Sequence, residues 1–138
     1  MNLAQLLAGI NWLAVVVATV IAFAVGATWY SKALFGNAWM EEVGLTEETM
    51  NSTNMPVTFG GTFVLQFLSM TALAACLGSD STWLSGLEAG LLIGVFWVAT
   101  AYGITYLFER RTMRLFMING GYYVVLFAIV GTVLGYWH

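Results

Sequence analysis

Four long apolar segments run through this chain, and none carries a charged residue near its centre. We place them at residues 10–29, 57–77, 87–108 and 115–137. A helix needs about 20 mostly apolar residues to cross roughly 30 Å of hydrocarbon. The segments therefore predict an all-α fold, an integral membrane bundle of four transmembrane helices.

The composition and length agree with a small membrane protein. Only 8% of the residues are charged, whereas soluble domains carry about 25%. Four spans use most of the 138 residues and leave no room for a second core. We therefore expect a single four-span transmembrane domain over residues 1–138.

The basic residues predict the orientation. Lys32 lies in the first connection, and Arg110, Arg111 and Arg114 lie in or beside the third. Short connections rich in Lys and Arg stay in the cytoplasm. We expect a longer cytoplasmic connection between the first and second spans, with both termini outside. The three arginines either bind anionic lipid head groups or only set this orientation.

Several residues mark the expected ends of helices. Asn37 can cap a short helix that Gly44 ends, and Thr46 can cap a second short helix. Ser85 and Glu88 have the spacing of a capping box that would open the third span. The alternative is that Glu88 carries protons at the outer mouth of the bundle.

Small residues recur at every fourth position of three spans, so they share one face of each helix. Such faces allow close approach of two helices in a membrane, either within one chain or between copies of a homo-oligomer. The sequence leaves both interpretations open. The helix-packing residues are Ala14, Ala18, Ala22, Gly26, Gly86, Gly90, Gly94, Gly131 and Gly135.

Polar and aromatic side chains gather in the inner halves of the four spans. They form either an interfacial belt with hydrogen bonds between helices, or a cavity for a small amphipathic ligand. A buried amide needs a hydrogen-bond partner, and lipid offers none. The candidate ligand-binding residues are Trp29, Gln66, Tyr102, Thr105, Tyr106, Asn119, Tyr122 and Tyr123.

The chain lacks the patterns of known catalytic and metal sites. His138 is the only histidine and Cys76 the only cysteine, and no Gly-rich phosphate loop follows a strand. We expect no enzyme activity, cofactor, metal or nucleic-acid partner. A membrane enzyme that acts on lipid would need a deep carboxylate or histidine, which the sequence does not offer.

Two end motifs resemble a known family. They are residues 9–15 with 26–31 and 34–39, and residues 108–111 with 116–122, Gly131, Leu134 and Trp137. Together they are similar to a bacterial membrane family catalogued as domain of unknown function seventeen-sixty-one. The resemblance implies a four-span membrane protein, and supplies no activity, substrate or cofactor. We expect the protein in the bacterial inner membrane. Family members often have histidine where Tyr123 stands.

Two functional hypotheses follow. The first is a small membrane protein that binds or passes a small amphipathic molecule at the inner-half polar-aromatic cluster. The second is a structural or accessory subunit that packs in a homo-oligomer or on a larger membrane complex. Membrane lipid is the surrounding partner in either case.

The orientation can be tested by labelling. Single cysteines at positions 2, 82 and 113, in a Cys76→Ser background, should divide between the two sides of the membrane in intact cells. Because the basic connections are expected inside, an impermeant thiol reagent should label positions 2 and 82 but not 113. Labelling at 113 alone would overturn the orientation.

Overall fold

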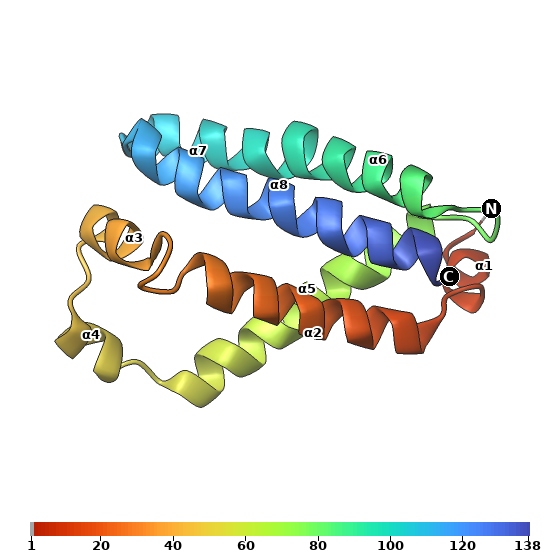
Figure 1. Ribbon diagram of the computed structural model, residues 1–138, viewed down its shortest axis with the longest axis horizontal. Coiled ribbons are helices and arrows are strands. Elements are labelled where there is room, and N and C mark those ends of the chain that lie inside the picture. Colours follow the sequence, from red (N-terminus) through yellow and green to blue (C-terminus); the bar gives the residue numbers. More distant parts are fainter. Residues whose placement is uncertain (1) are drawn as a thin grey trace.

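The computed structural model describes residues 2–138, which contain four helices long and apolar enough to cross a membrane (Figure 1). The first two are α2 (Trp12–Trp29) and α5 (Met55–Cys76), and the last is α8 (Met113–Tyr136). The third joins α6 (Trp83–Ile93), a π-helical segment (Gly94–Ala99) and α7 (Thr100–Glu109). The predicted all-α bundle is confirmed. The short helices are α1 (Leu3–Ala8), α3 (Gly36–Val43) and α4 (Glu47–Asn51).

The first and third connections lie at the same end of the bundle, which we call the connection end (Figure 1). Helices α3 and α4 and the turn between α7 and α8 lie there, whereas α1 and the C-terminal end of the chain lie at the other end. All four basic residues therefore gather at one end of the bundle. That this end faces the cytoplasm stays a prediction.

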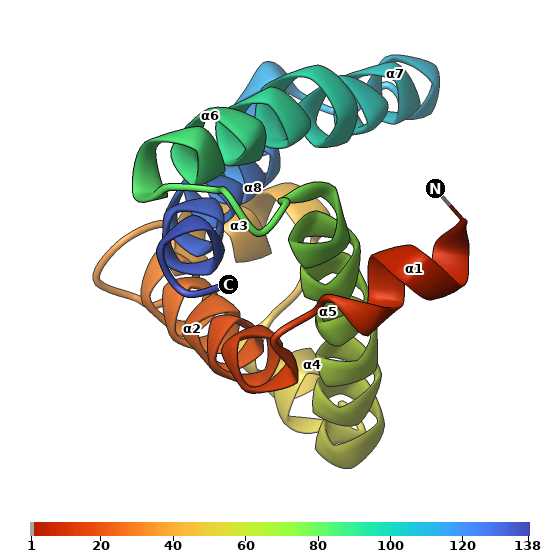
Figure 2. The same cartoon turned by 90° about the vertical axis from the view of Figure 1, so that its right-hand side faces the viewer.

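Helix α8 is the centre of the bundle, with α6 and α7 on one side and α2 and α5 on the other (Figure 2). Glycines bring α6 and α8 into backbone contact. Gly86 lies against Gly131 and Gly135, and a Cβ atom on Gly90 would overlap the carbonyl oxygen of Phe127. Close approach of this kind is a main source of helix association in lipid.

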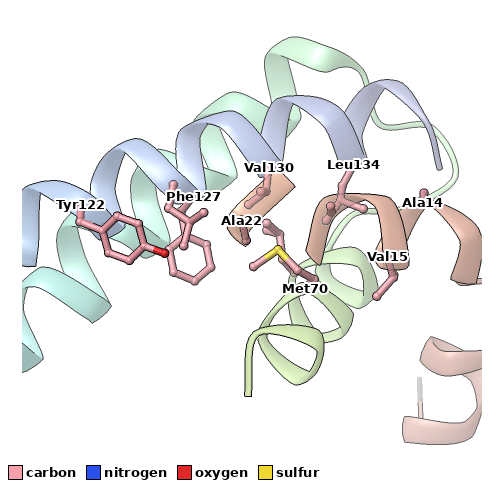
Figure 3. Packing of buried hydrophobic residues seen from close by; sticks show 11 residues of the cluster. Ala14, Val15, Ala22, Met70, Tyr122, Phe127, Val130 and Leu134 are labelled. Carbon is pink, nitrogen blue, oxygen red and sulfur yellow. The ribbon is translucent and has the colours of Figure 1, made fainter. Parts of the chain in front are cut away.

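The alanine face of α2 packs against α5 and α8. Ala14, Ala18 and Ala22 are fully buried there, in a cluster with Met70 of α5 and Val130 of α8 (Figure 3). The small-residue faces are thus occupied within one chain. A second copy or a larger complex would have to use a different surface.

Helix α5 has fully buried residues only in its second half. Met70 and Leu73 are its buried residues, and no residue from 55 to 69 is buried. The helix is inclined to α2 and crosses it, so its first half diverges from α8 (Figure 1). This divergence leaves space at the connection end of the bundle.

The structure corrects two predicted caps. The third span opens one turn earlier than predicted, because Thr82 is extended and forms the capping box with Ser85, leaving Glu88 inside the helix and exposed. Asn37 does not cap α3, because the helix already begins at Gly36 and Asn37 is its second residue; the Gly36 N–H donates to the Ser31 carbonyl at 2.9 Å. The other predicted signals, at positions 44 and 46, are confirmed.

The α6–α8 contact predicts opposite effects for two glycine-to-alanine changes. Gly90→Ala should lower the free energy of unfolding by about 1–3 kcal/mol, because the new methyl group meets backbone. Gly61→Ala on α5 is the matched control, since nothing lies within 4 Å of its Cβ position. It should leave stability unchanged or raise it by up to about 1 kcal/mol. Unfolding followed by circular dichroism in detergent measures both, and equal stability of the two variants would contradict the packing argument.

Candidate functional site

A cavity of about 680 Å³ lies at the connection end. Helices α2, α5, α7 and α8 form its walls, and residues of α3 and α4 cover its end. Small and apolar residues and three threonines make up most of the lining, and no charged side chain is among the described residues that line it. The larger lining residues that carry a polar side-chain atom are Tyr30, Trp39, Gln66, Tyr102, Tyr106, Asn119, Tyr122 and Tyr123, and Phe23 and Phe59 add two apolar rings.

The cavity exists because the diverging half of α5 faces a wall of tyrosines. Tyr102 and Tyr106 are four residues apart on α7, so they lie on one face of that helix. A π-helical turn accommodates an extra residue and turns the downstream face of the helix. The segment Gly94–Ala99 thus helps to set the direction in which α7 presents its tyrosines.

Asn119 joins three helices through hydrogen bonds. The Tyr30 hydroxyl donates to Asn119 Oδ1 at 2.7 Å, and Asn119 Nδ2 donates to the Tyr106 hydroxyl at 2.6 Å. The residue is buried and lines the cavity. The Asn119 amide therefore links helices by hydrogen bonds, as one of the two predicted interpretations requires. It also places polar atoms at the cavity wall.

Gln66 forms the second polar contact of the cavity. Its Nε2 donates to the Tyr122 hydroxyl at 3.1 Å, which connects α5 to α8. Its Oε1 is buried and has no hydrogen-bond partner among the described residues. Such an acceptor costs free energy in a low-dielectric environment.

Aromatic rings continue around the wall between these polar groups. Tyr102 stacks on Tyr123 with ring centroids 5.3 Å apart, and Tyr123 meets Tyr122 at 4.8 Å. Tyr30 contacts Tyr122 at 5.2 Å and Trp39 at 5.6 Å. These separations are in the favourable range for aromatic pairs. The rings therefore support one another and form a firm apolar surface with hydroxyl groups at its edges.

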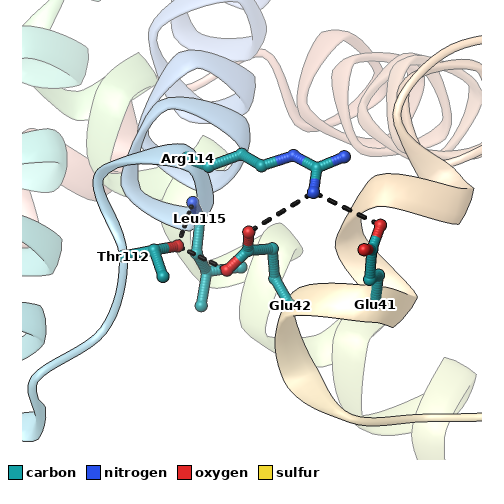
Figure 4. Close-up of polar contacts among 5 residues, drawn as sticks. All are labelled: Glu41, Glu42, Thr112, Arg114 and Leu115. Atoms are coloured by element: carbon teal, nitrogen blue, oxygen red, sulfur yellow. Dashed lines mark hydrogen bonds and ion pairs between the residues drawn. The ribbon is translucent and has the colours of Figure 1, made fainter.

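Charged residues hold α3 over the connection end. Arg114, in the first turn of α8, donates to Glu41 at 3.3 Å and lies 3.5 Å from Glu42 (Figure 4). The Thr112 hydroxyl donates to Glu42 and also caps α8 by accepting from the Leu115 amide. The network attaches the helix that carries Trp39 to the start of the helix that carries Asn119.

A second ion pair links the end of α2 to α4. The hydrogen bond with Glu47 raises the pKa of Lys32 and lowers the pKa of Glu47 from their ordinary values. Both side chains are exposed, and ion pairs of this kind contribute little to stability. The pair therefore adds little to the attachment of α4, which carries Met50 of the cavity lining.

The structure brings together most of the predicted ligand-binding residues but not two of them. Trp29 points away from the cavity lining, and its Nε1 donates to the Ile118 carbonyl at 3.0 Å. Thr105 is exposed on the outer side of α7. The predicted residues that line the cavity are Gln66, Tyr102, Tyr106, Asn119, Tyr122 and Tyr123.

The sequence-based prediction missed the contribution of the first connection. Trp39 and Met40 of α3 line the cavity, and Met50 of α4 joins them. The signal was present, since an apolar pair stands beside Glu41 and Glu42 and gives α3 an apolar side. An apolar side of this kind is equally typical of a helix that lies along the membrane interface, so the sequence alone does not place it over a cavity.

Asn119 provides a test of the site as a structural unit. Asn119→Leu removes two hydrogen bonds and leaves the hydroxyls of Tyr30 and Tyr106 without these partners. We expect a loss of roughly 1–2 kcal/mol in the free energy of unfolding. Thr105→Val, on the exposed side of α7, should cost much less. Thermal unfolding in detergent would compare them, and equal stability would show that the Asn119 contacts do not tie the helices together.

Comparison with known proteins gives a family but no activity. A family model described as "Protein of unknown function (DUF1761)" matches residues 13–135, which include nearly all of the four membrane helices. No curated protein and no solved structure matches the chain. The match confirms the resemblance of the end motifs, and the chain belongs to the DUF1761 family of proteins of unknown function.

Proposed function

We propose that this protein binds a small amphipathic molecule in the cavity at its connection end. The main support for this proposal is that the cavity and the polar residues Gln66 and Asn119 lie in the same place. The cavity of about 680 Å³ lies within the range of about 300–1,000 Å³ that is usual for small-molecule sites. Its walls are mainly apolar and aromatic, with a few convergent amide and hydroxyl groups, which is the usual composition of such sites.

The same lining supports a binding or passage role rather than catalysis. No histidine, cysteine or carboxylate is among the described residues that line the cavity. General acid–base and nucleophilic catalysis usually depend on such groups. With the connection end on the cytoplasmic side of a bacterial inner membrane, the ligand would reach the site from that side.

A structural or accessory role is the alternative function. The glycine and alanine faces that suggested it are occupied inside the chain. Exposed apolar residues of α5, such as Val64 and Leu65, remain available to a partner. The same residues suit lipid equally well, so they favour neither a homo-oligomer nor a larger complex.

Filling the cavity tests the binding proposal. Thr62 lines the cavity from α5, whereas Val64 on the same helix is exposed and lies outside the lining. We expect Thr62→Trp to abolish saturable binding of alpha-naphthol, an uncharged aromatic alcohol, and Val64→Trp to retain it. Isothermal titration calorimetry of the protein in lipid nanodiscs, corrected with empty nanodiscs, makes the measurement.

Two results would count against the proposal. One is the absence of saturable binding to the wild-type protein. The other is equal binding by the two folded tryptophan variants, because the probe would then occupy lipid or another surface. Size-exclusion profiles establish that both variants are folded.

A further inference from the structure

The unpartnered oxygen of Gln66 indicates what a ligand must supply. Gln66 Nε2 is already used, because it donates to the Tyr122 hydroxyl. The buried Oε1 has no partner among residues 2–138, and the residue lines the cavity. A carbonyl oxygen is only an acceptor. The group that would satisfy it must therefore be an O–H or N–H donor.

The amide of Asn119, by contrast, is satisfied within the protein. Tyr30 donates to Asn119, and Asn119 donates to Tyr106, so these residues are bound to one another. Among residues 2–138, Gln66 Oε1 is the buried side-chain oxygen without a hydrogen-bond partner, and it belongs to a residue of the cavity lining. The site thus has one buried unpaired acceptor in addition to the hydroxyl groups of its wall.

The lining also argues against a charged ligand. None of the described lining residues carries a charge, and Glu41, Glu42 and Arg114 are paired with one another outside the lining. A charge without a counter-charge is strongly disfavoured in an apolar site. The tyrosine rings offer flat apolar surface instead.

We infer that the ligand is an uncharged molecule with an O–H or N–H donor on a flat apolar body, and that it donates to Gln66 Oε1. This inference rests on the proposed function and specifies its ligand class. Gln66 is then the specificity-determining residue of the site, and Tyr122 holds its amide in place.

Three probes of similar size separate the requirements. Alpha-naphthol has a donor, its methyl ether has none, and alpha-naphthoate carries a negative charge. An unpaired buried polar group costs about 1–3 kcal/mol, which corresponds to a preference of roughly fivefold or more. We expect naphthol to bind wild-type protein in nanodiscs at least about fivefold more tightly than the ether. Naphthoate should show no saturable binding.

Substitution of Gln66 tests its part in this preference. Gln66→Met keeps the length of the side chain and removes the amide, so naphthol and the ether should bind alike. Thr105→Val, outside the cavity, should keep the wild-type preference. Even if Gln66→Met fails to fold, the comparison of the three probes on wild-type protein decides the ligand class.

The failures of the two proposals are distinguishable. If naphthol and the ether bind equally to wild-type protein and Thr62→Trp blocks both, the site binds ligands but the donor requirement is wrong. Comparable binding of naphthoate at that site would refute the uncharged class. A preference that survives in folded Gln66→Met would remove the role of Gln66. If Thr62→Trp blocks no probe, the proposed function fails as well.

Discussion

The backbone contact between α6 and α8 is the constraint on which the rest of the bundle depends. Gly86 and Gly90 allow α6 to lie directly on α8, and no side chain fits between them. In lipid, where apolar expulsion does not bring helices together, such packing supplies much of the attraction. Because the same helix continues into α7, the contact also sets Tyr102 beside Tyr123 of α8. Packing at one end thereby organises the polar wall at the other.

On the opposite side of α8, helix α5 has no glycine contact of this kind with its described neighbours. Helix α2 has a continuous alanine face and packs along its length, whereas α5 has two fully buried side chains, Met70 and Leu73. Gly60 and Gly61 of α5 have no neighbour within 4 Å of their Cβ positions. The diverging half of α5 therefore forms a cavity wall, while Phe59 and Phe63 keep it in contact with Phe23 of α2. The α3 helix, whose Glu42 contacts both Arg114 and Thr112 at the start of α8, covers the space that results.

Much of this architecture could be predicted from the sequence. The lengths of the apolar segments predicted the four spans. Because buried amides need hydrogen-bond partners, Asn119 and Gln66 were correctly predicted to lie inside the bundle. The errors concern side chains whose direction depends on the rotation of a helix about its own axis. Thr105 has the same depth as Tyr106 but is rotated by about 100° from it on a regular helix, and it is exposed. Depth can be read from the sequence, but the π-helical turn and the inclination of α5 depend on tertiary packing. The capping box at Thr82 was misplaced by one turn because the sequence offers similar signals at both positions.

The hydrogen bonding of the buried polar side chains connects the fold to the proposed ligand. Lipid cannot hydrogen-bond, so a membrane bundle must pair its polar side chains internally. Asn119 does so with two tyrosines from α2 and α7, and this network holds three helices together. Gln66 lies on the helix that diverges, and its position leaves one buried oxygen without a hydrogen-bond partner among the described residues. The feature that opens the cavity is therefore also the feature that leaves an acceptor unpaired in a residue of its lining. Shape and hydrogen-bonding capacity at this site have a common origin in the incomplete packing of α5.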